Sequence, residues 1–138
     1  MSEGNFSFFD TNVLVYMYGN DLEKKAISRQ LFAKHGTAGS LMLSTQVIQE
    51  FYVISSRKLK MPKQETQTTV RRFLELPFVR IGSEHILAAF EKEERYEISF
   101  WDGLVLAAAE ASGAETLYTE DLNHGQMYGT VRVINPFR

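Results

Sequence analysis

Short apolar runs alternate with longer helical patterns along this sequence, and this alternation restricts the fold more than any other feature. Five runs are short and apolar enough to be strands, at residues 6–9, 41–43, 78–81, 116–118 and 131–134. Helical periodicity fills most of the intervals between them. Strands separated by helices usually lie parallel in one sheet that helices cover on both faces. The sequence therefore predicts an α/β fold with a mostly parallel sheet.

The spacing of apolar residues also predicts which helix faces are buried. One pattern places Ile86, Leu87 and Phe90 on a single face, which we expect to point into the core. The next pattern starts at Ser99, a residue type that is common at helix N-caps. Within this second helix we expect Trp101 to act as an anchor in the core.

The size and composition of the chain exclude several classes of protein. At 138 residues and 15.8 kDa, residues 1–138 fit one domain with a single core. A formal charge of −2 excludes a polycation that holds nucleic acid by bulk charge. The sequence has no cysteine, which excludes disulfides, thiolate zinc sites and a thiol nucleophile, and fits the reducing cytoplasm.

Membrane insertion and secretion are not expected. No apolar run approaches the roughly 20 residues that a membrane span needs. Residues 1–4 lack the charged and apolar regions of a signal peptide. We therefore expect a cytoplasmic protein with no membrane partner.

Three of the four aspartates stand beside apolar runs, where a solvated charge is least expected. Asp10 follows the first predicted strand, and Asp121 follows the strand at 116–118. Asp102 lies in the first turn of an apolar helix, and Glu50 flanks the buried stripe of another. The carboxyl ends of parallel strands and the N-termini of the next helices meet at one edge of a sheet. We therefore expect these acids to face one crevice.

Such a crevice would favour a divalent cation. Several carboxylates that face one another repel unless a positive charge lies between them. Mg²⁺ and Mn²⁺ are hard cations that take carboxylate oxygens. A metal held in this way can lower the pKa of a bound water for attack on phosphorus and stabilise the departing oxygen. The acids therefore favour metal-assisted hydrolysis of a phosphodiester.

Each acid also has a purely structural interpretation. Asp102 lies three residues after Ser99, as in a capping box. Asp10 could begin a turn after its strand, and Asp121 could cap a short helical turn. Glu50 could be an ordinary surface residue. A non-catalytic binding module therefore stays open, as does a receiver-like signalling domain with an acidic Mg²⁺ pocket, although no lysine follows the last strand as such a pocket requires.

Four segments in order resemble the acidic motifs of PIN-domain ribonucleases, and in particular VapC-type toxins of type II toxin–antitoxin pairs. These segments are residues 8–14, 49–52, 99–109 and 117–126, and the likeness extends to residue 137. The resemblance implies a PIN-like fold with a twisted sheet of about four to five strands, dependence on Mg²⁺ or Mn²⁺, and cleavage of single-stranded RNA. Gly103 stands where we expect alanine, and a glycine inside a helix costs roughly 1 kcal/mol.

The resemblance implies a role for each matching residue. Four acids match the acidic quartet of the family, namely Asp10, Glu50, Asp102 and Asp121. Asp10 and Asp102 are expected to be the firmest metal ligands. The other two acids are expected to complete the site, in part through waters. Thr119 matches a small hydroxyl residue that would orient a carboxylate or a metal-bound water. Asn12 is expected to hold Asp10 in place by a hydrogen bond.

Partners follow from the same resemblance. It implies a homodimer that a small VapB-like antitoxin silences by lying across the cleft, with DNA contacted only through the antitoxin. The apolar stretch at 51–54 exceeds what one buried stripe requires, and one side chain could contact a second subunit. The alternative within the same fold is a housekeeping RNA-processing nuclease without an antitoxin.

Positive charge is concentrated in one part of the chain. Residues 57–80 carry a net charge of +5, whereas the rest is acidic. A positive flank beside a negative cleft suits a phosphate chain that is steered to a metal. Because they follow the helix of Glu50, Arg57, Lys58 and Lys60 are the preferred candidates for contact with substrate RNA.

Overall fold

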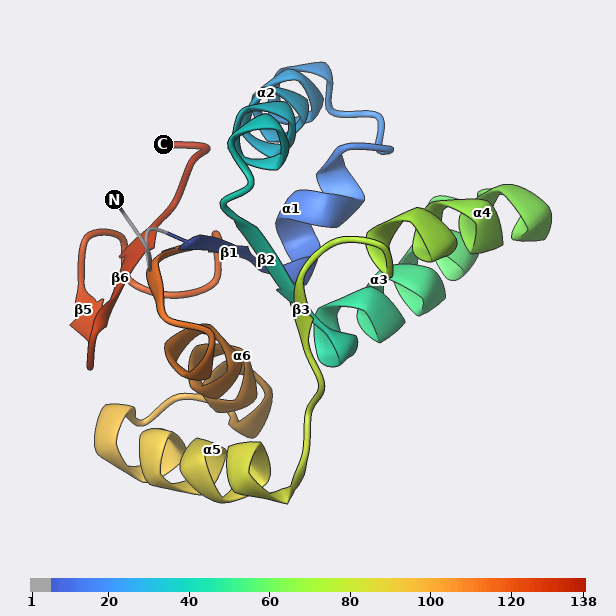
Figure 1. The fold of residues 1–138 in the computed structure, drawn as a ribbon. Helices are drawn as coiled ribbons and strands as arrows, with labels where there is room; N and C mark the ends of the chain where they lie inside the picture. The colour runs from blue at the N-terminus through green and yellow to red at the C-terminus, as the bar shows by residue number, and fades with distance from the viewer. Residues whose placement is uncertain (1–5) are drawn as a thin grey trace.

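A computed structural model describes residues 6–138, which form a six-stranded sheet with helices on both sides (Figure 1). The strands are β1 (Phe6–Phe9), β2 (Leu41–Ser44), β3 (Phe78–Val79), β4 (Ala114–Tyr118), β5 (Met127–Tyr128) and β6 (Val131–Ile134). The helices are α1 (Thr11–Tyr16), α2 (Leu22–Ala38), α3 (Thr45–Arg57), α4 (Lys63–Phe73), α5 (Ser83–Tyr96) and α6 (Phe100–Ala111). Residues 1–4, on which the expectation about a signal peptide rests, lie outside the described residues.

The sheet is parallel except at one edge. Its order is β3-β2-β1-β4-β6-β5. All neighbouring strands pair in parallel except β5, which runs antiparallel to β6. The predicted α/β class is confirmed, and the sheet has six strands where the family resemblance implied four to five.

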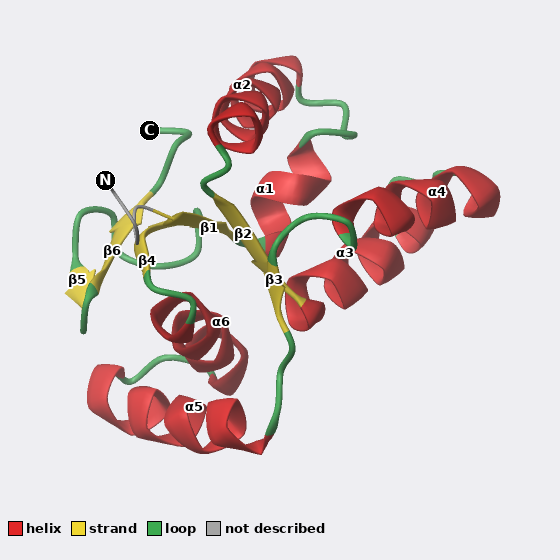
Figure 2. Ribbon diagram, viewed as in Figure 1, coloured by secondary structure: helices red, strands yellow, loops and turns green. Residues whose placement is uncertain are grey.

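Helices cover both faces of the sheet (Figure 2). On one face α6 packs against β4, β2 and β6, and on the other α2 packs against β2 and α1. Helix α5 lies outside α6 and forms an additional layer. The core between these layers contains fully buried apolar side chains such as Phe8, Leu43, Leu106, Leu117 and Val133. Within residues 6–138, each helix is too short or too polar to cross a bilayer.

The longer elements agree with the sequence, and two short ones were not expected. The bounds of β1 and β6 are those predicted, and Ser44 and Ser99 are N-caps whose side chains accept backbone N–H groups. Helix α1 begins directly after β1, with Asp10 as its N-cap. Strand β5 has only two residues. Neither element is long enough to show a period in the sequence.

The expected orientation of α5 is wrong. Ile86, Leu87 and Phe90 are exposed. The helix instead buries Lys92, whose Nζ donates to Glu110 Oε1 of α6 at 2.8 Å. The difference arises because α5 packs on another helix, not on the sheet, and a long cation paired with a carboxylate fills that contact.

Trp101 does not anchor α6 in the core, because 60% of it is exposed. Leu104, Val105 and Ala108 on the same helix are buried, as expected. Trp101 lies in the first turn, at the wall of a cleft, and its ring packs against Phe100 with the centroids 5.2 Å apart. Trp101 therefore belongs to the wall of the cleft and not to the core.

Close packing of α5 on α6 requires glycine at position 103. A Cβ atom on Gly103 would lie 2.9 Å from the backbone oxygen of Ala89. Because a backbone oxygen can retreat only if the two helices separate, we expect Gly103→Ala to lower the free energy of unfolding by about 1–3 kcal/mol. This is the net change, after the roughly 1 kcal/mol by which alanine is the better helix former.

Urea unfolding of the purified variants measures this difference. Gly36→Ala is the matched control, because Gly36 also lies in a helix, and a Cβ there would have no neighbour within 4 Å. The control is expected to be as stable as the wild type or up to about 1 kcal/mol more stable. If Gly103→Ala is as stable as this control, the close contact between Gly103 and Ala89 is contradicted.

Candidate functional site

The site begins where the neighbouring parallel strands β1 and β4 end, because polar residues follow both strands. Strand β1 lies parallel to β4, and the backbone N–H of Asp10 donates to the Tyr118 carbonyl oxygen at 3.1 Å. Thr119 and Asp121 follow directly after β4. The crevice that the parallel topology predicts at this edge therefore begins with residues from two distant parts of the chain.

Three carboxylates meet in this crevice. Asp10, Asp102 and Asp121 each offer one oxygen, and these oxygens lie within 4.8 Å of one another. Asp102 comes from the first turn of α6. All three line a cleft of about 690 Å³, together with Glu50. The structure thus brings together three members of the acidic quartet as a cluster and places the fourth in the same cleft.

Asp10 is the most constrained of the acids. It is 5% exposed, and its two oxygens accept hydrogen bonds from the backbone N–H of Thr11 (2.7 Å) and from Thr119 Oγ1 (2.8 Å). The pKa of Asp10 is raised from 3.8 to about 7, mainly by burial and in smaller part by the nearby charges of Asp121 and Glu50, and the two hydrogen bonds oppose this rise. Asp10 therefore holds its negative charge at a cost unless a cation is present.

Asp102 has a similar electrostatic setting. Burial is the main cause that raises the pKa of its carboxyl, and the negative charges of Asp121 and Glu50 add to it. Its backbone N–H donates to Ser99 Oγ at 3.0 Å, so the predicted helix cap is present. The cap bond uses the backbone N–H of Asp102, and a hydrogen bond between Ser99 and the carboxyl group opposes part of the rise in its pKa, so the cap is compatible with a place for this carboxylate in the cluster.

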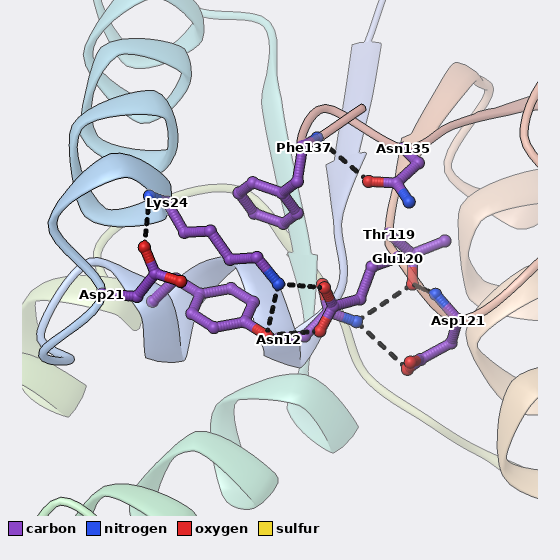
Figure 3. Close-up of polar contacts among 9 residues, drawn as sticks. Asn12, Asp21, Lys24, Thr119, Glu120, Asp121, Asn135 and Phe137 are labelled. Carbon is purple, nitrogen blue, oxygen red and sulfur yellow. Dashed lines mark hydrogen bonds and ion pairs between the residues drawn. The ribbon is translucent and has the colours of Figure 1, made fainter.

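Asn12 and Thr119 connect Asp10 with Asp121, and Figure 3 shows their contacts with Asp121. Asn12 Nδ2 donates to Thr119 Oγ1 (3.0 Å) and to Asp121 Oδ2 (3.1 Å). The backbone N–H of Asp121 also donates to Thr119 Oγ1 (3.1 Å). The direct bond expected from Asn12 to Asp10 is replaced by an indirect link, because Thr119 stands between them. One hydroxyl group therefore fixes Asp10, Asn12 and Asp121 relative to one another.

Glu50 lines the same cleft but is not one of the three clustered carboxylates. Its Oε1 accepts from Thr11 Oγ1 at 2.6 Å, and its Oε2 accepts from Gln46 Nε2 at 3.3 Å. Gln46 is buried on α3 one turn before Glu50 and also donates to the backbone oxygen of Trp101 (3.3 Å). Gln46 was not expected in the site. The signal for it in the sequence is a polar residue four positions before Glu50 on the same helix face.

A second network braces the loop that carries Asp121. Lys24 Nζ donates to Glu120 Oε1 (3.0 Å) and to the Tyr16 hydroxyl (3.2 Å), as Figure 3 shows for Lys24 and Glu120. The rings of Tyr16 and Phe137 lie within cation–π range of the same ammonium group. These contacts tie α1, α2 and the C-terminal segment to the residue before Asp121. The sequence gives no signal for them, since lysines and glutamates are common on helix surfaces.

Of the three basic candidates, only one lines the cleft. Lys58 is exposed at the C-cap of α3 and belongs to the cleft wall. Arg57 and Lys60 are exposed, and the structure places them outside the described residues that line the cleft. Lys58 is therefore the one candidate that the geometry brings to the site.

The residues present fit a hard divalent cation. Three carboxylate oxygens converge, which is the donor type that such cations prefer. Two further acceptors, Asn12 Oδ1 and Gln46 Oε1, are buried without a hydrogen-bond partner among the described residues, and both side chains line the cleft. Waters held by a cation would supply the hydrogens that these oxygens lack. Asp10, Asp102 and Asp121 are thus the residues that could hold the metal.

A family model and solved structures show what the chain is similar to. The model of the PIN domain matches residues 7–129. No curated protein matches the sequence.

Several solved structures share the fold at low sequence identity. VapC20 from Mycobacterium tuberculosis, described as a sarcin-ricin loop cleaving toxin, superposes with a TM-score of 0.68 at 16% identity, over 83% of this chain and 89% of that one. A toxin–antitoxin complex from Klebsiella pneumoniae has a TM-score of 0.68 at 19% identity, over 94% and 97%. VapBC2 from Rickettsia felis, bound to a DNA fragment from its promoter, has a TM-score of 0.67 at 19% identity, over 93% and 96%.

Proposed function

The chain belongs to the PIN domain family, and from this premise we propose that it is a nuclease that uses Mg²⁺ or Mn²⁺ to hydrolyse phosphodiester bonds within single-stranded RNA. The observation that carries this proposal is the convergence of three carboxylates in one cleft, with oxygens within 4.8 Å of one another. Because the chain belongs to this family, the alternative of a receiver-like signalling domain is discarded.

Each residue of the site has a distinct task in this reaction. Asp10, Asp102 and Asp121 hold the metal, and Thr119 keeps Asp10 oriented through its 2.8 Å hydrogen bond. When bound, the cation supplies Lewis-acid stabilisation of the phosphate and activation of a water. Asn12 and Gln46 present free carbonyl oxygens that can accept hydrogen bonds from water in the cleft and so orient it.

The substrate is held by charge of the opposite sign. Lys58 lies on the wall of the acidic cleft and is placed to pair with a phosphate of the RNA chain. The other basic groups between residues 57 and 80 supply a longer-range attraction, and we propose Arg57 and Lys60 as contacts for RNA that extends beyond the cleft. Glu50 adds negative charge near the aspartates, and this charge strengthens the binding of a cation.

We further propose that the protein is the toxin of a toxin–antitoxin pair, residues 1–138 forming one nuclease domain that acts in the cytoplasm. The support is the similarity to a Klebsiella pneumoniae toxin–antitoxin complex and to VapBC2. The partner would be a small VapB-like antitoxin, which would mediate any contact with DNA. An antitoxin arginine that enters the cluster would neutralise the same carboxylates as the metal. An adjacent antitoxin reading frame distinguishes this proposal from a housekeeping nuclease.

A homodimer is part of the same proposal. Val53 in the apolar stretch 51–54 is exposed on α3, and Ile86, Leu87 and Phe90 are exposed on α5. Exposed apolar side chains in this number are typical of a surface that another chain covers. Sedimentation velocity at several protein concentrations measures the oligomeric state.

Cleavage of RNA in the presence and absence of metal tests the enzymatic proposal. Purified protein with millimolar Mg²⁺ is expected to cut a labelled single-stranded RNA internally, and excess EDTA is expected to lower the rate at least about 100-fold. Added Mn²⁺ should restore the activity. Single-stranded DNA of the same sequence serves as the comparison substrate. Cleavage that EDTA leaves unchanged would contradict a metal-dependent nuclease.

A further inference from the structure

The cleft is lined by an aromatic side chain, Trp101, to which the proposed reaction gives no role. Trp101 precedes the proposed metal ligand Asp102 in the sequence and lines the same cleft. It is 60% exposed, which is unusual for a tryptophan. Ile54 of α3 also lines the cleft and adds apolar surface. The cleft therefore combines an acidic cluster with a large aromatic side chain that no protein residue covers fully.

Trp101 is held in place although it is exposed. Its ring packs against Phe100, with centroids 5.2 Å apart and planes at 73°, and Phe100 packs in turn against Phe90 of α5 at 5.8 Å. Its backbone oxygen accepts from Gln46 Nε2 at 3.3 Å, and Gln46 also bonds to Glu50. Side-chain packing and a polar link to the acidic site thus fix this residue. Such preorganisation lowers the entropic cost of binding a flat ligand.

We propose that Trp101 is a base-stacking residue, on which the nucleobase next to the scissile phosphate of a single-stranded RNA rests. This inference rests on the proposed function. A nucleotide offers a phosphate for a metal at the acidic cluster, a flanking phosphate for Lys58 and an aromatic base for Trp101, and all three protein groups line one cleft. Stacking of bases on aromatic side chains is the usual means of holding single strands without reading their sequence.

The placement of Trp101 favours RNA over a protein partner for this residue. The exposed side chains Ile86, Leu87 and Phe90 of α5 lie outside the described residues that line the cleft. A protein that uses Trp101 as part of an apolar surface would cover these residues too. Trp101 instead lies on the wall beside Asp102, where the nucleotide at the cleavage site has to lie.

Trp101 is the only tryptophan of the chain, so its fluorescence reports on the cleft directly. The wild-type protein in EDTA is titrated with a short single-stranded oligouridylate, and with a ribose-phosphate chain of equal length that lacks bases. The oligouridylate is expected to quench the emission in a saturable way, and the abasic chain is expected to leave it nearly unchanged. Equal quenching by both chains, or none by either, would overturn the proposal.

Cleavage kinetics give the second measurement. Trp101→Ala is expected to raise KM for RNA about 5- to 150-fold with a smaller change in kcat, and Trp101→Phe to stay within a few-fold of the wild type. Leu22→Ala is the control, because Leu22 is exposed and lies outside the cleft lining. The thermal shift caused by Mg²⁺ should be the same in all variants, which shows that the metal site is intact.

The outcomes separate this inference from the proposed function. If the wild type cuts no RNA in Mg²⁺, the proposed function fails, and the fluorescence titration still decides whether bases stack on Trp101. If the wild type cuts RNA and Trp101→Ala has an unchanged KM, stacking is wrong and the nuclease stands. If Trp101→Ala weakens self-association while KM is unchanged, the residue is a contact between protein chains, and the proposal is again overturned.

Discussion

Asp10→Asn is expected to slow metal-dependent cleavage of RNA about 1,000-fold or more and, at the same time, to stabilise the metal-free protein. The loss of activity follows because the substitution removes a carboxylate from a cluster of three, and metal catalysis of this type contributes several kcal/mol. The gain in stability follows because Asp10 is 5% exposed and its burial disfavours the charged form. An amide of the same shape carries no such charge.

The stability gain is expected to be about 1–3 kcal/mol at pH 8 in EDTA. The raised pKa of Asp10 sets an upper limit of about 4 kcal/mol. Part of this is lost because asparagine has an NH2 group in place of one carboxylate oxygen, so it can accept only one of the two hydrogen bonds that Thr11 and Thr119 donate to Asp10. Urea unfolding and cleavage assays on the same preparation measure the two effects.

Asp21→Asn is the matched control for this experiment. Asp21 is the exposed N-cap of α2 and lies outside the cleft lining, and asparagine caps helices as well as aspartate. The control should therefore cleave RNA and unfold like the wild type. Full activity in Asp10→Asn would point to a contaminating nuclease or to another site.

The metal-free protein is expected to lose stability as the pH rises from about 4 to 7. Asp10 has a folded-state pKa of about 7 against an ordinary value of 3.8, so between these values the folded protein keeps a proton that the unfolded chain has lost. Its contribution is therefore complete below pH 3.8 and falls by about 1.4 kcal/mol per pH unit up to pH 7, at most about 4 kcal/mol in total. The raised pKa of Asp102, caused mainly by burial, acts in the same direction.

Urea unfolding at a series of pH values, in EDTA and in Mg²⁺, tests this dependence. Burial lowers the pKa of His35, which opposes the trend near neutral pH, and the difference between the wild type and Asp10→Asn isolates the part due to Asp10. Mg²⁺ should restore the stability lost at pH 7, by about 2.7 kcal/mol at a concentration 100-fold above its Kd. If the free energy of unfolding depends on pH in the same way in the wild type and in Asp10→Asn, the raised pKa of Asp10 is contradicted.

Periodicity and caps predicted most of the fold because they are local properties of the chain. The bounds of β1 and β6 and the cap Ser99 agree with the structure. The orientation of α5 could not be predicted in this way, because an apolar stripe does not tell whether a helix packs on a sheet, on another helix or on a partner. Gly103 shows the same limit, since only the approach of Ala89 reveals why it is glycine.

The site was predictable where topology alone brings residues together. Asp10 and Asp121 follow adjacent parallel strands, so their proximity follows from the strand order. The network of Lys24 and Glu120 depends on side-chain geometry between elements that share no sequence pattern. The exposure of Trp101 depends on the cleft that its helix lines, which no local feature of the sequence encodes.

Strand β1 lies at the centre of the sheet, and the amide of Asp10 is bonded to β4 at the point where the site begins. Amide protons in such interior strands exchange with solvent mainly through opening of the whole domain, whereas edge strands and helix ends open locally. Asp10, at the end of β1, is thus held on the part of the molecule that opens last. Partial melting of the edge strand β5 would then leave Asp10 in place, whereas melting of α5 would remove the helix against which Gly103, next to Asp102, packs.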